Sequence, residues 1–132
     1  METEVEITGE RIGGGRGTGG GGVGAGGGAG ARVEFVGVVR GTEGGRAISA
    51  LRYEAYRPMA ENQMRKILLE LNRSHPCLRA RVIHRIGVVP VGEAAIHVSV
   101  EAVHRAEAFA LVSVFMDRLK EDVPIWKAAV LG

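Results

Sequence analysis

A glycine-rich tract near the N-terminus limits how much of this 132-residue chain can build a folded core. Between Gly13 and Gly30, thirteen of eighteen residues are glycine, and large side chains are almost absent. Such a segment has little apolar surface to bury and a high entropic cost of ordering, so we expect a flexible tether. A Gly-x-Gly-x-x-Gly match at Gly15, Gly17 and Gly20 is expected by chance at this glycine density. No strand leads directly into it and no helical pattern follows immediately, which argues against a dinucleotide-binding loop.

The remaining chain is long enough for one compact domain, predicted to span residues 31–132. Residues 1–30 are expected to contribute a short strand, where polar and apolar residues alternate over residues 4–8, and then the flexible segment. The formal charge is +2, and residues 1–30 carry a net −2, so the predicted domain carries +4. This mild basicity suits a small anionic ligand or an acidic partner, and it falls short of the basic surface of a nucleic-acid-binding protein.

The remaining composition excludes several classes of protein. One cysteine rules out an internal disulfide and a multi-cysteine zinc site, and the four histidines are scattered without metal-ligand spacing. We expect Cys77, beside Pro76, to be a buried structural thiol. No apolar run approaches the ~18 residues needed to cross a membrane, and the N-terminus lacks the pattern of a secretory signal. We therefore expect a cytoplasmic protein with no membrane segment, metal or cofactor.

Apolar periodicity predicts the order of the secondary-structure elements. Residues 32–39 and 47–56 are typical of strands, and the glycine pair between them favours an antiparallel hairpin. Within the first of these strands, Gly37 indicates a bulge or a close backbone approach. Pro58 suits the first turn of a helix that we expect to end near Asn72, because apolar residues follow at helical spacing.

The second half of the chain repeats the strand and helix patterns. Residues 77–86 and 94–101 are predicted strands, separated by a turn at residues 87–92. A last helix is expected from about His104, followed by a short tail. The chain is therefore predicted to be α+β, with a mostly antiparallel sheet and two main helices.

Residues 117–127 bring two of the three lysines into one short stretch. Lys120 lies in the last turn of the predicted helix, and Pro124 cannot continue that helix. The chain should therefore bend, with Trp126 anchoring the returning segment, so that Lys120 and Lys127 can converge on one pocket. The simpler alternative is a helix C-terminus whose cations interact favourably with its dipole, followed by a packed aromatic side chain.

Six motifs in register over about residues 31–127 identify a family resemblance. They are Phe35-Val-Gly-Val-Val-Arg40, Tyr53-Glu-Ala-Tyr56, His84-Arg85-x-Gly87, Val91-Gly-Glu93, His104-Arg-Ala-Glu-Ala-Phe109, and Asp117-Arg-Leu-Lys120 through Val123-Pro-Ile-Trp-Lys127. With these motifs the chain resembles the large, catalytic subunit of molybdopterin synthase. Each motif is weak alone, and their shared order carries the resemblance.

The resemblance implies an α/β-hammerhead-like fold and a sulfurtransferase of molybdenum cofactor biosynthesis. In that family the large subunit is a homodimer, and each copy binds one small ubiquitin-like carrier to give a heterotetramer. The carrier ends in Gly-Gly with a C-terminal thiocarboxylate. Two sulfurs pass in succession to cyclic pyranopterin monophosphate, which forms the dithiolene of molybdopterin. No cysteine of the large subunit is required, because the carrier brings the sulfur.

The resemblance also implies the functional residues. The catalytic residues would be Lys120 and Lys127, and the substrate-binding residues would be Arg40, His104, Arg105 and Phe35, some of them contributed across the dimer. Fixed cations stabilise the negative charge that develops during sulfur attack. Arginine offers phosphate a planar fork, and lysine offers a movable point charge.

Three departures from the family pattern leave a second hypothesis open. The glycine-rich tract stands where relatives usually have a helix, the loop after Arg40 reads Gly-Thr-Glu-Gly, and the tail lacks a charged ending. A non-catalytic dimeric module that docks the carrier without turnover is therefore the main alternative, and a phosphate-binding regulatory domain is a weaker one. Outside the implied site, we interpret His84 and Arg85 as structural and Tyr53 as hairpin packing.

Overall fold

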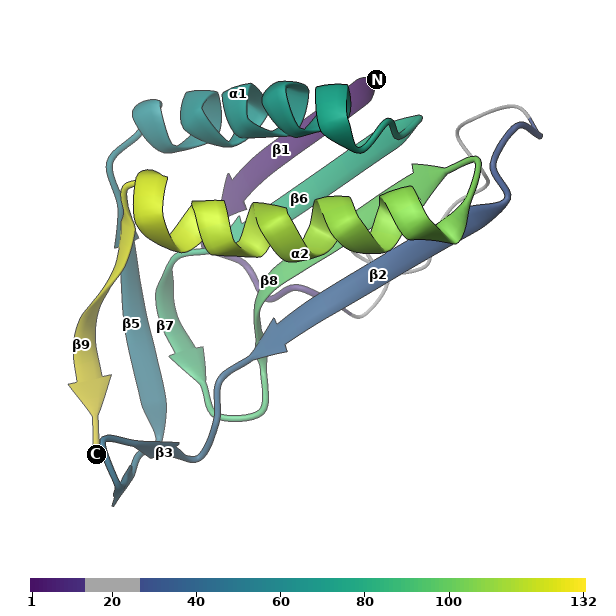
Figure 1. Ribbon diagram of the computed structural model, residues 1–132. Helices are drawn as coiled ribbons and strands as arrows, with labels where there is room; N and C mark the ends of the chain where they lie inside the picture. The colour runs from purple at the N-terminus through teal and green to yellow at the C-terminus, as the bar shows by residue number, and fades with distance from the viewer. Residues whose placement is uncertain (14–26) are drawn as a thin grey trace.

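Two helices cover one face of a four-stranded sheet (Figure 1). The computed structural model describes residues 1–13 and 27–132, so most of the predicted tether lies outside the described residues. The helices are α1 (Met59–Ser74) and α2 (Arg105–Asp122). The strands, in spatial order, are β1 (Glu2–Thr8), β6 (Arg79–Arg85), β8 (Ala94–Ala102) and β2 (Ala31–Val38). β1 is parallel to β6, and the other neighbours are antiparallel.

The main core lies between the helices and this sheet. Ile96, Val98 and Val100 of β8 are buried against the helices, as the predicted alternation requires. Phe115 of α2 is fully buried within the same cluster, and Ile7 of β1 belongs to it as well. The prediction of an α+β fold with two helices and a mostly antiparallel sheet is therefore confirmed.

A second, three-stranded sheet stands at the end of the molecule where α2 ends (Figure 1). Its central strand β5 (Ala50–Ala55) pairs antiparallel with β7 (Gly87–Pro90) and β9 (Ile125–Leu131). Two predictions are wrong here. Residues 87–92 contain a strand and are not only a turn, and the expected tail after the last helix is β9.

The predicted hairpin of residues 32–39 with residues 47–56 is also wrong. β2 pairs with β8, and β5 belongs to the second sheet. The glycine pair closes only a small hairpin between β3 (Thr42–Glu43) and β4 (Arg46–Ala47). Gly44 and Gly45 both have positive φ, 59° and 80°, as a two-residue type I′ turn requires. The turn chemistry was therefore recognised correctly, but the strands that it joins are much shorter than expected.

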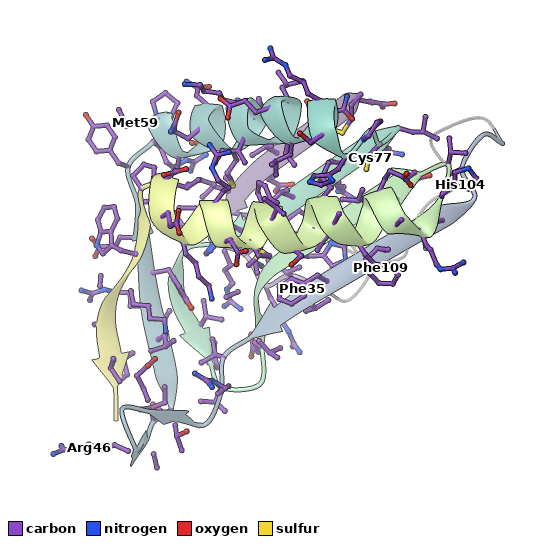
Figure 2. All side chains as sticks on the ribbon, in the orientation of Figure 1. Phe35, Arg46, Met59, Cys77, His104 and Phe109 are labelled. Atoms are coloured by element: carbon purple, nitrogen blue, oxygen red, sulfur yellow. The ribbon has the colours of Figure 1, made fainter. Side chains whose placement is uncertain are left out.

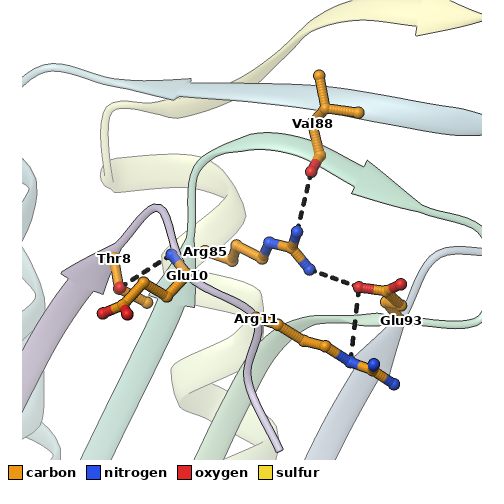
Figure 3. A network of polar contacts seen from close by, with 6 residues as sticks. All are labelled: Thr8, Glu10, Arg11, Arg85, Val88 and Glu93. Carbon is orange, nitrogen blue, oxygen red and sulfur yellow. Dashed lines mark hydrogen bonds and ion pairs between the residues drawn. The ribbon is translucent and has the colours of Figure 1, made fainter.

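An ion-pair network centred on Arg85 ties the N-terminal segment, β7 and the start of β8 together (Figure 3). The Arg85 guanidinium donates to Glu93 Oε1 at 2.7 Å and to the Val88 carbonyl at 3.2 Å. Arg11 approaches the same carboxylate oxygen at 3.7 Å. The Glu93 carbonyl in turn accepts the backbone N–H of Val39 at 3.0 Å, so this network fixes the chain immediately before Arg40.

Neither helix in the described part of the chain is long and apolar enough to span a membrane.

Candidate active site

A cavity of about 380 Å³ lies where the C-terminal turn of α2 meets β5, β9 and the end of β2. α2 ends at Asp122, and β9 begins at Ile125 after the proline, so the predicted bend is present. Lys120 and Lys127, which the sequence predicted to converge, both line this cavity. Trp126 also lines it, with 45% of its surface exposed, so it is a wall residue and not a buried anchor.

The pairing of β9 with β5 sets the position of Lys127. Lys127 lies opposite Tyr53 in the antiparallel register, next to an irregularity between Arg52 and Tyr53. Its ammonium forms an ion pair of 3.1 Å with Glu43, from the small β3–β4 hairpin. Both side chains are partly exposed, so this pair orients Lys127 more than it stabilises the fold.

Two further titratable side chains face the same cavity, Tyr53 and His84. Their rings meet edge to face, with centroids 5.4 Å apart and an interplanar angle of 69°. Burial raises the pKa of the Tyr53 hydroxyl, Lys127 opposes that effect, and Glu43 adds to it. Burial lowers the pKa of His84, partly offset by a hydrogen bond to the Arg85 carbonyl. Both side chains are therefore neutral at pH 7.

Gly37 allows β2 to close one wall of the cavity. The β2–β8 register shifts between Gly37 and Val38, which confirms the predicted bulge. A Cβ at position 37 would lie 2.8 Å from Ile96 Cγ2, so the predicted close approach is present as well. A larger side chain here would have to displace Ile96, because real Cβ atoms do not approach other heavy atoms this closely.

A second hollow, of about 440 Å³, runs between β2 and α2 and is largely apolar. Phe35 and Phe109 line it from the two elements, with 37% and 59% of their surfaces exposed (Figure 2). We call this second hollow the apolar groove, and the cavity that contains Lys120 and Lys127 the lysine cavity. Met116 and Lys120 line both of them. Lys120 therefore lies at the junction of an apolar groove and a polar cavity.

The other predicted substrate-binding residues lie outside both hollows. His104 and Arg105 are exposed at the start of α2, and Figure 2 shows His104 at the far end of that helix. Arg105 precedes Lys120 by fifteen residues, about 22 Å along a helix axis. Arg40 is exposed after β2 and lines neither of the two hollows. One chain thus places Lys120 beside Lys127 in the cavity and beside Phe35 in the groove, and it leaves Arg40, His104 and Arg105 outside both hollows.

The other candidate groups are accounted for by structural contacts. Cys77 is buried, as expected, and burial together with Glu107 raises the pKa of its thiol to about 11. A thiol in this state is a poor nucleophile at neutral pH. Among the residues that the structure describes, no group of three or more histidine, cysteine or carboxylate side chains is placed to hold a metal ion.

Sequence reasoning missed two residues of the cavity wall. Tyr53 was assigned to hairpin packing and His84 to a structural role, yet both line the cavity that holds the lysines. Both lie within motifs that carried the family resemblance, which was the available signal. Alternation along residues 47–56 alone does not reveal the role of Tyr53, because that role depends on pairing with Lys127 of β9, more than seventy residues later.

The fold and the cavity define a small α+β protein with a cationic site between its two sheets. Comparison with known proteins identifies the family to which this chain belongs. The MoaE protein family matches residues 23–122, and the chain belongs to this family.

Curated relatives named molybdopterin synthase catalytic subunit support this membership. The human protein is 45% identical over 96 residues, which are 73% of this chain and 51% of the relative. The Thermoplasma volcanium protein is 43% identical over 101 residues, 76% of this chain and 74% of the relative. The chain spans about half the length of the mammalian relatives that it matches.

Solved structures agree with the fold. Molybdopterin synthase from Staphylococcus aureus is 34% identical with a TM-score of 0.71, and the match covers 79% of this chain and 80% of that one. Molybdopterin cofactor biosynthesis protein E from Burkholderia multivorans is 28% identical with a TM-score of 0.76, covering 96% and 82%. The family resemblance that the motifs predicted is therefore confirmed.

Proposed function

We propose that this chain is a sulfurtransferase of molybdenum cofactor biosynthesis. In this proposal it moves sulfur from the thiocarboxylated C-terminus of a small ubiquitin-like carrier to cyclic pyranopterin monophosphate, which yields molybdopterin. The observation that carries the proposal is the convergence of Lys120 and Lys127 on one cavity, in a chain whose relatives are named molybdopterin synthase catalytic subunits.

The two hollows suit the two reactants of this reaction. The apolar groove beside Phe35 is open to solvent and lies between β2 and α2, which suits a Gly-Gly tail with no side chains of its own. The lysine cavity offers two cations for a phosphate and for charge that develops on the reacting atoms. Lys120, at the junction, would contact both the thiocarboxylate and the pyranopterin. Lys127, held by Glu43, would contribute a second fixed positive charge.

The position of Arg105 supports a site that is completed by a second copy of the chain. Within one chain, Arg105 and His104 lie at the opposite end of α2 from Lys120. Their exposure at a helix N-terminus nevertheless suits an anionic ligand. A homodimer would bring this end of one α2 to the lysine cavity of the partner, and two carriers would complete a heterotetramer. Arg40 would join the substrate phosphate from its loop after β2.

A reconstitution assay tests the proposed function directly. Purified chain is mixed with thiocarboxylated carrier and cyclic pyranopterin monophosphate, and dithiolene formation is followed together with complex formation on gel filtration. We expect both a complex and product. Carrier binding without dithiolene would favour the docking-only alternative, and the absence of any complex would favour the phosphate-binding regulatory domain.

Mixing two variants tests the shared site. Lys120→Ala and Arg105→Ala are each expected to be impaired at low pyranopterin concentration, where binding limits the rate. If each site takes Lys120 from one copy and Arg105 from the other, a mixed dimer contains one intact site. Equal mixing and re-equilibration should then restore about a quarter of wild-type activity. No recovery, with subunit exchange verified by differently tagged copies, would contradict a site shared between copies.

A further inference from the structure

His84 is a buried polar residue that the proposed roles of the two lysines leave unused. It lies on β6 with only 5% of its surface exposed, and it is one of the residues that line the cavity with Lys120 and Lys127. A histidine of this kind needs a reason beyond packing, because burying a polar ring is unfavourable unless its nitrogens have partners.

The backbone defines which nitrogen carries the proton. His84 Nδ1 lies 2.8 Å from the carbonyl oxygen of Arg85. Because a carbonyl can only accept, Nδ1 must carry the hydrogen and donate it. In the neutral imidazole the other nitrogen, Nε2, is then an acceptor. Burial lowers the pKa of His84, so the neutral form is the one present near pH 7.

The surroundings hold this acceptor in one place. The Tyr53 ring packs against the imidazole edge to face, and Tyr53 is itself fixed opposite Lys127 by the pairing of β5 with β9. The charged side chains of the cavity, Lys120 from α2 and Lys127 from β9, are donors only. His84 therefore adds an uncharged acceptor to a cavity whose charged groups attract the anionic part of a ligand.

We propose that His84 is a substrate-binding residue whose Nε2 accepts a hydrogen bond from an N–H or O–H of the heterocycle that occupies the lysine cavity. This inference rests on the proposed function and deepens it. The lysines would hold the phosphate and stabilise developing charge, whereas His84 would recognise the ring system. A reduced pterin carries several N–H donors, so it matches a site with one fixed acceptor. Sites that hydrogen-bond a substrate donor strongly reject analogues that lack it.

Two substitutions test the roles of the two ring nitrogens of His84 separately. His84→Asn keeps an amide N–H near the Nδ1 position, where it can still donate to the Arg85 carbonyl, and has no atom at the Nε2 position. His84→Gln places an amide near the Nε2 position, where its carbonyl oxygen can act as the acceptor. We expect His84→Asn to raise the KM for pyranopterin by about tenfold or more with a small change in kcat. His84→Gln should recover most of the affinity.

A structural role for His84 predicts a different pattern. Equal losses of affinity in the two variants, or a lower kcat at unchanged KM in His84→Asn, would overturn the proposal. Thermal unfolding of both variants without ligand provides the folding control. Carrier affinity should stay at the wild-type value in both, because His84 does not line the apolar groove.

A measurement on the wild-type protein does not depend on either variant folding. In protein labelled with ¹⁵N-histidine, pyranopterin should move the Nε2 resonance of His84 and leave its Nδ1 resonance almost unchanged, whereas an unmoved Nε2 resonance at saturation would overturn the proposal. Failure of the wild-type chain to bind or convert pyranopterin would overturn the proposed function together with this role. Wild-type activity with an unchanged KM in His84→Asn would overturn the role of His84 alone.

Discussion

Replacing Lys120 with alanine should lower the rate of dithiolene formation by about a hundredfold or more, the usual effect of removing one preorganised charge-stabilising group. Lys120 is the cation that lines both the apolar groove and the lysine cavity, so it can act on both proposed reactants at the point where sulfur would be transferred. The measurement is single-turnover product formation at saturating carrier and pyranopterin, where binding no longer limits the rate.

The chain provides its own control for this experiment. Lys66 is exposed on α1 and lines neither hollow, so Lys66→Ala removes the same charge and should leave the rate unchanged. Carrier binding by the Lys120 variant should persist on gel filtration, because the apolar wall of the groove remains. Near-normal product formation by Lys120→Ala would contradict the role assigned to this lysine.

Phe115→Ala should lower the free energy of unfolding by about 3–5 kcal/mol, the range for deleting a fully buried aromatic side chain. Phe115 is completely inaccessible in the core between α2 and the four-stranded sheet. Its loss removes apolar contacts and leaves a cavity that the neighbouring side chains can only partly fill. Urea unfolding at 25 °C measures the change, and the midpoint should fall without a large change in slope.

Phe109→Ala is the matched control, because Phe109 lies on the same helix and is 59% exposed. Its effect on stability should stay within about 0.5 kcal/mol. Similar destabilisation by the two substitutions would contradict the assignment of the core to the face of α2 that carries Phe115. Since Phe109 lines the apolar groove, its variant also separates an effect on carrier binding from an effect on folding.

Local patterns were sufficient for the elements and for the lysine pair. Strict alternation in residues 94–101 predicted β8, and apolar spacing predicted the two helices. The bend between Lys120 and Lys127 followed from Pro124, whose ring forbids a continued helix. Each of these inferences needed only residues that lie within a few positions of one another.

Pairing between distant segments was beyond the same reasoning. Nothing near residues 32–39 indicates that their partner is β8, more than fifty residues later, and not the next strand. β7 has only four residues, and both β7 and β9 obtain their hydrogen bonds from β5, which lies far from each of them in the sequence. The cavity wall is equally hard to predict, because Tyr53 lies opposite Lys127 only after β5 and β9 have paired, and His84 lines the same cavity from β6 in the other sheet.

The chain immediately before Arg40 is held by residues that lie more than forty positions away in the sequence. Val39 is buried; its N–H donates to the Glu93 carbonyl, and its own carbonyl accepts the N–H of Gly92. The Glu93 side chain is in turn bonded to Arg85. The stretch after Arg40, which departs from the family pattern, begins beyond this anchorage. Substitutions in that loop can therefore accumulate without moving the backbone of Arg40. A variable loop is thus compatible with a constant position of this arginine.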